Sequence, residues 1–313
     1  MAEPSVVPLP GVHGGDVERL ARALAVAPEE ILDLSATLNP LAPPVGAVVR
    51  AVCDAAARYP DPAMATAALA EAIGVDPCRL LLTNGGAEAI ALVAGELRSA
   101  CVVEPEFSLW RRHLDLVTAD PSRRVRSNPN NPTGALAGAD ERAAVFDEAF
   151  YPLSTGEWTR GDAEGGAVVV GSLTKLFACP GLRLGYVLTP EPGVVERLRM
   201  RQVAWSVGSV ALAALPHLLA RAALGAWARE LRVLRRQLVE ILGGAGLHPV
   251  AKDAPWVLVE DAAWIREPLA RQRVLVRDCA SFGLAGTVRI AVPGPQGLER
   301  LALALAAVTG GRP

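Results

Sequence analysis

One lysine in the sequence stands among residues that could make it chemically reactive. Lys175 lies in the segment 171–185, which directly follows the apolar run 167–170 and is otherwise almost uncharged. Ser172 precedes it by three residues and Arg183 follows it by eight. A lysine in apolar surroundings beside another cation has a lowered pKa and becomes nucleophilic toward a carbonyl group. Because a hydroxyl and an arginine can also bind phosphate, the segment suits a cofactor that carries both an aldehyde and a phosphate.

Two further loops fit the same ligand. Residues 83–90 (TNGGAEAI) follow an apolar run and open a predicted helix, where small residues let backbone N–H groups approach an anion closely. The run 145–150 (VFDEAF) places an acidic pair after a short apolar segment, and a carboxylate there would keep a pyridine nitrogen protonated. Taken alone, each loop has a plainer interpretation: a structural strand–helix turn for the first, and a surface acidic pair for the second.

The elements that must position these loops alternate along the chain. Short apolar runs at 80–82, 101–103 and 167–170 are each followed by a loop rich in Gly, Asn, Pro or Ser, with helical patterns between them. This alternation predicts an α/β fold with a mostly parallel central sheet and helices on both faces. Ligands bind at the carboxyl ends of the strands in such sheets, so the loops after the strands are where chemistry is expected.

The pattern changes after Pro190. A long helical region rich in Arg and Leu is predicted over 193–242, with breaks near 206–208. Strands are predicted over 256–259, 274–276 and 287–292, and a short amphipathic helix over 17–25. We therefore expect a large domain at 45–198, and a smaller α+β domain formed by residues 1–44, with an N-terminal arm, together with 199–313.

Composition argues against several classes of protein. The net charge of −2, without a basic stripe, gives no electrostatic footprint for nucleic acid. No stretch predicts a membrane span, and the N-terminus lacks the pattern of a signal peptide. The five cysteines are scattered without a CxxC motif, which argues against a disulfide framework or a zinc site. A cytoplasmic location with reduced thiols is the expectation.

A further loop carries the most distinctive motif. Residues 127–134 (SNPNNPTG) hold Asn and Pro at a density that predicts a turn. NPNNPTG, DEAF and SLTKLFACPGLRLGY, in this order, resemble the fold-type I pyridoxal-phosphate enzymes, the aspartate-aminotransferase-like superfamily. The resemblance covers essentially the whole chain, and it implies pyridoxal 5′-phosphate (PLP) as the cofactor.

The resemblance also implies a role for individual residues. Lys175 would bind the cofactor as a Schiff base, Asp147 would contact the pyridine nitrogen, and Asn131 would contact the phenolic oxygen. Phe107 would stack on the cofactor ring. The cofactor phosphate would be bound by Gly86, Ala87, Ser172 and Arg183. Tyr59, in Arg-Tyr-Pro-Asp-Pro, resembles a tyrosine that reaches the phosphate from the partner subunit. That match implies a homodimer with shared sites.

The two ends of the chain narrow the resemblance. The runs 13–16 (HGGD) and 32–41 (LDLSATLNPL), with 275–284 and 288–292, resemble the threonine-phosphate decarboxylases of cobalamin biosynthesis. By this resemblance Arg289 would bind the substrate α-carboxylate. The residues expected near the substrate phosphate are His13, Asn39 and Arg277. The plainer interpretations are an ordinary loop histidine for His13 and a surface arginine for Arg289.

The implied reaction is decarboxylation of O-phospho-L-threonine, or of a close phosphoamino acid, to an amino-alcohol phosphate. The Cα bond that stands perpendicular to the cofactor ring is the one that breaks, and no sequence motif fixes that angle. If the Cα–H bond breaks with Lys175 as general base, the protein would be an aminotransferase of the histidinol-phosphate type. A third possibility is a catalytically reduced PLP-binding protein.

The sequence departs from the family pattern in two ways. Position 150 is Phe, where aminotransferases usually carry Tyr. The stretches 107–128 and 134–147 are shorter than is usual in the family, which predicts that the large sheet lacks a strand–helix unit in each. This trimming favours the catalytically reduced protein, whereas retention of the cofactor residues together with Arg289 argues against it.

Overall fold

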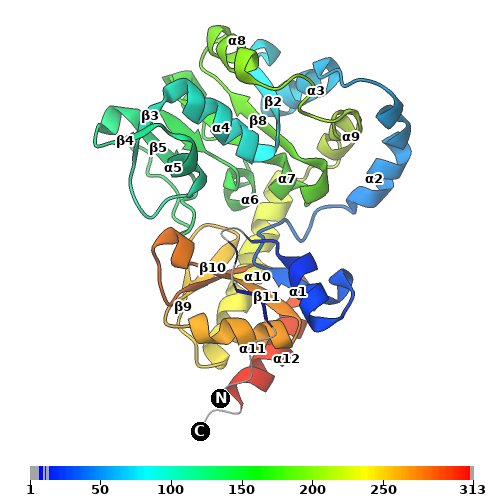
Figure 1. Ribbon diagram of the computed structural model, residues 1–313, viewed down its shortest axis with the longest axis vertical. Coiled ribbons are helices and arrows are strands. Elements are labelled where there is room, and N and C mark those ends of the chain that lie inside the picture. The colour runs from blue at the N-terminus through cyan, green and yellow to red at the C-terminus, as the bar shows by residue number, and fades with distance from the viewer. Residues whose placement is uncertain (1–6, 10, 12–13, 311–313) are drawn as a thin grey trace.

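The protein has two lobes, each built around its own sheet (Figure 1). The computed structural model describes residues 7–9, 11 and 14–310. A seven-stranded sheet forms the upper lobe of Figure 1, and a five-stranded sheet forms the lower lobe. The two ends of the described chain both lie on the lower lobe.

The larger sheet is mostly parallel, as predicted. Its spatial order is β2-β8-β7-β6-β5-β3-β4, and only the two pairs that involve β8 are antiparallel. The central strands are continuous apolar runs, which is typical of a parallel sheet covered on both faces. The strands are β2 (Leu80–Asn84), β3 (Ser99–Val102), β4 (Leu116–Thr118), β5 (Arg124–Ser127), β6 (Val145–Asp147), β7 (Val168–Gly171) and β8 (Leu184–Leu188).

The prediction that the short stretches remove strands is wrong. Both β4 and β5 are present, and between them lies only the 3-10 helix Pro121–Arg123. Thr118 at the end of β4 and Arg124 at the start of β5 both lie opposite Cys101 of β3. A parallel connection normally has to run back along the sheet. Because β5 starts at the level where β4 ends, a five-residue link suffices and no crossover helix is needed.

The connection from β5 to β6, all of which the structure describes, also lacks a helix. Alternate side chains of a strand share a face, so Arg124 and Arg126 of β5 point the same way. Glu141 of the connecting loop pairs with both of them, at 2.9 Å each. An ion-pair cluster therefore occupies this face of β5, where a packed helix would require apolar side chains.

Helices cover the sheet and join the lobes. The long helix α10 buries one face, formed by Trp227, Leu231, Leu234 and Leu238 among others, and it contacts elements of both lobes (Figure 1). The predicted break in the helical region is confirmed, because α8 ends at Arg201 and α9 begins at Ser209, so that residues 206–208 lie between the two helices. The helices are α1 (Val17–Leu24), α2 (Val45–Val52), α3 (Ala63–Ile73), α4 (Gly85–Leu97), α5 (Leu109–His113), α6 (Tyr151–Thr155), α7 (Leu173–Leu176), α8 (Pro192–Arg201), α9 (Ser209–Leu219), α10 (Leu224–Gly244), α11 (Arg266–Arg271) and α12 (Pro295–Thr309).

The smaller sheet draws on both ends of the chain. Its order is β1-β11-β12-β10-β9, with β1 parallel to β11 and the remaining pairs antiparallel. The three strands predicted after residue 250 are present, whereas β1, a strand of only three residues, was not predicted. The helix α9 packs against α2 and α3, so part of the region predicted as small domain lies on the large lobe. The strands are β1 (Leu32–Leu34), β9 (Pro249–Ala251), β10 (Trp256–Val259), β11 (Val274–Asp278) and β12 (Val288–Ala291).

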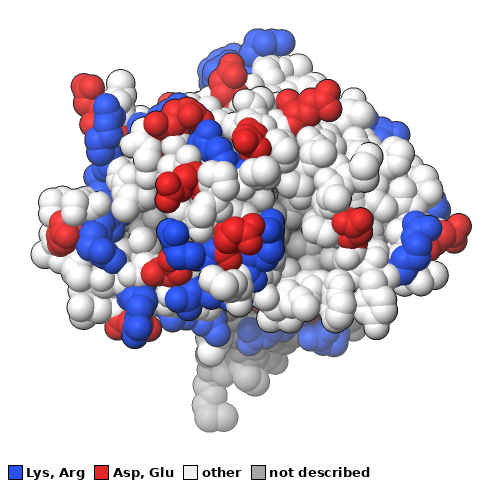
Figure 2. All heavy atoms as spheres, turned by 90° about the horizontal axis from the view of Figure 1, so that it is seen from above, with Lys and Arg blue, Asp and Glu red and all other residues white. Residues whose placement is uncertain are grey.

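Within the described residues, no single helix combines the length and apolarity needed to span a membrane. The helices α9 and α10 meet that requirement only as a pair, and the chain bends by 85° between them. Seen from above, the large lobe carries acidic and basic side chains interspersed over its surface (Figure 2).

Candidate active site

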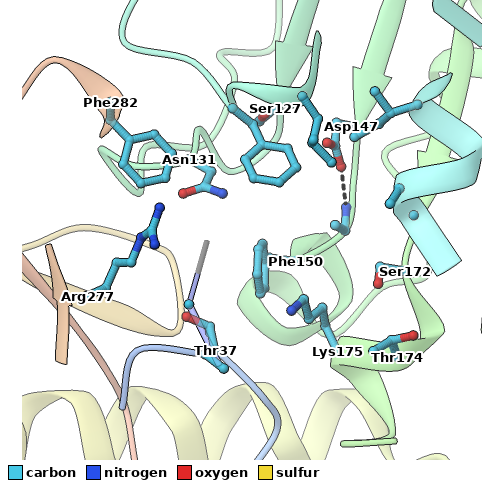
Figure 3. A pocket seen from close by; sticks show the side chains of 18 of the residues that line it. Thr37, Ser127, Asn131, Asp147, Phe150, Ser172, Thr174, Lys175, Arg277 and Phe282 are labelled. Atoms are coloured by element: carbon cyan, nitrogen blue, oxygen red, sulfur yellow. Dashed lines mark hydrogen bonds between the residues drawn. The ribbon is translucent and has the colours of Figure 1, made fainter. Parts of the chain in front are cut away.

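A cavity of about 510 Å³ lies between the lobes, within the size range of small-molecule sites. The large lobe contributes loops at the carboxyl ends of β5, β6 and β7 and the N-terminus of α4. The small lobe contributes the segment after β1 and side chains of β11 and β12. Figure 3 shows polar side chains from both lobes converging on this space. The location matches the rule that ligands bind outside the carboxyl ends of parallel strands.

Lys175 points into this cavity from α7, next to Phe150 (Figure 3). Burial of the amine lowers its pKa from 10.5 to about 8, and the guanidinium groups of Arg289 and Arg183 add to the effect. A larger fraction of the amine is therefore neutral and nucleophilic near neutral pH. The chain contains one other lysine, Lys252, and that residue is exposed.

An anion cradle lies at the N-terminus of α4. Gly85 has a φ of +72°, and a side chain on it would approach Nη2 of Arg183 to 2.4 Å. A side chain on Gly86 would lie 3.5 Å from Cβ of Ser172. Gly86, Ser172 and Arg183 line the cavity together with Ala87. Backbone N–H groups, a hydroxyl and a guanidinium group thus converge on one point, an arrangement that suits a phosphate.

Asp147 ends β6 and is buried at the opposite side of the cavity from Arg277 (Figure 3). Burial, with a smaller contribution from the carboxylate of Glu106, raises the pKa of this carboxyl group to about 7. One carboxyl oxygen accepts a hydrogen bond of 3.1 Å from the backbone N–H of Ala149. A buried carboxyl group that binds a proton near neutral pH is suited to a basic ring nitrogen, which would share that proton.

Asn131 and Arg289 form a bonded pair. Nη1 of Arg289 donates to Oδ1 of Asn131 at 2.5 Å, so the amide nitrogen of Asn131 is left to donate to a ligand. Nη2 of Arg289 donates to the backbone oxygen of Ser35 at 3.4 Å, and its Nε has no hydrogen-bond partner within the described residues. Burial lowers the pKa of Arg289 to about 10, with Arg277 contributing.

The structure places most of the predicted residues around the cavity. Phe107, Asn131, Asp147, Lys175 and Arg289 line it, and so do the other predicted residues Gly86, Ala87, Ser172, Arg183 and Arg277. His13 lies outside the described residues. The ring of Tyr59 is 79% exposed and lies outside the lining of this cavity.

Asn39 is buried but does not line the cavity. Its amide donates to the backbone oxygen of Leu176 and its oxygen accepts from the N–H of Leu41, both at 3.0 Å. Thr37, from the same segment, lines the cavity instead, and its buried hydroxyl has no hydrogen-bond partner within the described residues. Figure 3 shows Thr37 between Arg277 and Lys175. The sequence did not predict Thr37, although it lies in the segment 32–41, in which Asn39 was the predicted substrate contact.

Comparison with known proteins agrees with this geometry. A family model for aminotransferases of class I and II matches residues 124–305. The threonine-phosphate decarboxylase of Salmonella typhimurium is 31% identical, over 96% of this chain and 97% of its own length. This chain belongs to the class I and II aminotransferase family. Another relative of this aminotransferase-family chain is histidinol-phosphate aminotransferase 2 of Pseudomonas aeruginosa, which is 28% identical over 98% of this chain and 97% of its own length.

Solved structures show the same fold. The histidinol-phosphate aminotransferase of Sinorhizobium meliloti, solved in complex with PLP, has a TM-score of 0.80 at 19% identity, covering 97% of this chain and 95% of its own. The L-threonine-O-3-phosphate decarboxylase of Porphyromonas gingivalis has a TM-score of 0.76 at 22% identity, covering 89% of this chain and 99% of its own. The aminotransferase-family chain therefore has the fold-type I architecture, including the smaller α+β lobe.

The family depends on PLP, and the residues of this site fit that cofactor. The cradle at α4 suits its phosphate, and the neutral amine of Lys175 suits its aldehyde. Asp147 and the amide of Asn131 suit the ring nitrogen and the phenolic oxygen. When bound, PLP supplies an electron sink for charge that develops at the Cα of an amino acid. The chain is thus a PLP-dependent enzyme of this family.

Proposed function

We propose that this enzyme decarboxylates O-phospho-L-threonine, or a close phosphoamino acid, to an amino-alcohol phosphate in cobalamin biosynthesis. The observation that carries the proposal is a pair of buried arginines on the small lobe. Arg277 of β11 and Arg289 of β12 lie directly opposite each other, and they are 4% and 6% exposed. Like charges in this position destabilise a sheet, so the pair is best explained by an anionic ligand.

A phosphoamino acid supplies two anionic groups to match the two arginines. Arg289, bonded to Asn131 and close to Lys175, would bind the α-carboxylate. Arg277, which donates to the backbone oxygen of Gly11 at 3.0 Å and to the hydroxyl of Ser281 at 2.8 Å, would bind the phosphate. Salmonella and Sinorhizobium relatives at 31% identity are both threonine-phosphate decarboxylases by name, which supports this substrate class.

The aromatic side chains around the arginines support the same binding mode. Phe282 lies beside both guanidinium groups, 5.4 Å from Arg277 and 5.9 Å from Arg289, measured from ring centroid to Cζ. Trp256 lies 5.0 Å from Arg289, measured in the same way. Contact with these rings would hold the guanidinium groups in place for the binding of an anion. Lys175, whose amine points into the same cavity, would serve as the general acid or base at the substrate Cα.

We further propose that the enzyme is a homodimer with shared sites. The rings of Tyr59 and Trp205 contact each other at a centroid distance of 4.9 Å with an interplanar angle of 37°, yet both residues are largely exposed. Tyrosine and tryptophan side chains exposed together in this way are typical of an interface. In the dimer, Tyr59 of the partner subunit would bind the cofactor phosphate. A cytoplasmic location accompanies the proposal, supported by five cysteines that are all free.

The second candidate is an aminotransferase of the histidinol-phosphate type, because relatives with that name match nearly the whole chain at 28% identity. Purified protein loaded with PLP and mixed with O-phospho-L-threonine separates the two. Release of CO₂ without conversion of PLP to pyridoxamine phosphate supports the decarboxylase. Formation of pyridoxamine phosphate with glutamate or histidinol phosphate, without release of CO₂, supports the aminotransferase and contradicts the proposal.

A further inference from the structure

Glu106 is a buried acid that the proposed reaction does not use. It precedes the cavity residue Phe107 and is 2% exposed. One carboxyl oxygen accepts from the N–H of Phe107 at 2.7 Å and from the hydroxyl of Ser127 at a shorter distance. The other accepts from the N–H of Ser127 at 3.0 Å and is 3.4 Å from the amide of Asn130. The side chain thus ties the loop after β3 to the end of β5.

The same contacts place Glu106 behind Asp147. Ser127, which donates twice to Glu106, is the cross-strand partner of Asp147 in the β5–β6 pair. Phe107, Ser127 and Asp147 all line the cavity, whereas Glu106 does not. Glu106 therefore stands in the layer of residues that supports the cavity wall at the position expected for the pyridine nitrogen.

The surroundings of Glu106 favour its ionised form more than burial alone would suggest. Burial has the largest effect and leaves the pKa of Glu106 above its ordinary value, while the donors of Ser127 and Phe107 and the charge of Arg126 limit that rise. Arg126 is only partly available to neutralise it, because that guanidinium group is already paired with Glu141. A carboxylate that accepts this many hydrogen bonds is stabilised as an anion.

We propose that Glu106 is a positioning residue for the cofactor: its negative charge, held behind Asp147, strengthens the binding of a proton between Asp147 and the pyridine nitrogen. The proposal rests on PLP occupying this cavity as described above. The negative charges of Glu106 and Asp147 together increase the affinity of this position for a proton. A protonated ring nitrogen is a stronger electron sink than a neutral one. The charged groups that face the pair are Arg126 from β5, and Glu104 from the same loop, which is paired with Arg111.

The test measures protonation directly. We expect Glu106→Gln to lower the titration midpoint of the Asp147 carboxyl group, read by ¹³C NMR in the PLP-free protein, by about half to one pH unit. With ¹⁵N-labelled PLP bound, the ring nitrogen of the variant should lose its proton at a correspondingly lower pH. Glu104→Gln is the matched control, because it removes a more exposed, arginine-paired acid from the same loop. It should shift both midpoints by much less than Glu106→Gln does, because the charge of Glu104 is partly exposed and is paired with Arg111.

A purely structural role predicts a different result. In that case Glu106→Gln lowers the free energy of unfolding but leaves both midpoints as in the wild type, and the proposal is overturned. If the variant does not fold, Asp147→Asn gives the reciprocal measurement, since coupled groups shift each other equally. The midpoint of Glu106 should then fall by a similar amount, and its constancy would overturn the proposal. The carboxyl titrations need no cofactor, so they stand even if PLP binding itself fails.

Discussion

The buried amine of Lys175 should make the PLP-free protein less stable than it would be without that charge. Its pKa is lowered from 10.5 to about 8, a difference of about 2.5 units, and each unit corresponds to 1.36 kcal/mol. The full penalty would be about 3 kcal/mol, and residual contact of the amine with solvent reduces it to about 1–3 kcal/mol. Replacing the lysine by the uncharged Met removes this penalty. We expect Lys175→Met to increase the free energy of unfolding at about pH 7 by that amount.

The pH dependence gives the sign of the effect. Below about pH 8 the amine is protonated in both the folded and the unfolded chain, so the penalty is complete. Between about pH 8 and 10.5 the folded chain loses the proton first, and the stability of the wild type rises toward that of the variant. Urea denaturation of both PLP-free proteins at about pH 7 and 9.5 measures the change. Lys252→Met, at an exposed lysine, should show no such trend. A stability difference for Lys175→Met that is the same at both pH values would refute the reasoning.

Three further predictions follow from the site. Arg277→Met should lower kcat/KM for phosphothreonine by about 100-fold, because a buried charge-assisted contact is worth a few kcal/mol, and a loss below about 3-fold in steady-state kinetics would contradict its role. Gly85→Ala should weaken PLP binding by at least about 10-fold in a fluorescence titration, because Gly85 has a positive φ and its new side chain would meet the guanidinium group of Arg183. Gly95→Ala, near the C-terminal end of the same helix where a side chain meets nothing within 4 Å, should leave PLP binding unchanged. Mixing the dimeric variants Tyr59→Ala and Lys175→Met should restore about a quarter of wild-type activity, because half of the dimers would be mixed and each mixed dimer would hold one intact site of its two. If the mixture is no more active than the separate variants, the sites are not shared.

The sequence predicted many of the residues that line the cavity because they stand at or shortly after the ends of strands. Asp147 ends β6, and Lys175 follows β7 by a few residues; both strands are short apolar runs, and such runs in a parallel sheet end at the same edge. The order of the motifs then identified the family. The alternating pattern also predicted the mostly parallel sheet, since buried parallel strands are continuous apolar runs.

The remaining features depend on tertiary contacts. Thr37 and Asn39 are both polar residues of one irregular segment, and only the fold decides that Asn39 bonds to the backbone while Thr37 faces the cavity. Glu106, between a proline and a phenylalanine, has the composition of a solvated loop residue, and its burial follows from the approach of β5. The stagger of β4 and β5 likewise leaves no signal along the chain. The short stretches 107–128 and 134–147 were visible in the sequence, but the sequence did not show that the strands would all remain while the connections lost their helices.

The most direct test of the account is to identify the residue that carries the cofactor. The purified, PLP-loaded protein would be reduced with borohydride, which fixes a Schiff base irreversibly, and the modified peptide would be identified by mass spectrometry. The chain offers two lysines, and only Lys175 lines the cavity. We expect a phosphopyridoxyl group on Lys175, and loss of the visible absorbance band in Lys175→Met but not in Lys252→Met. Modification of Lys252, or a band that survives Lys175→Met, would contradict it.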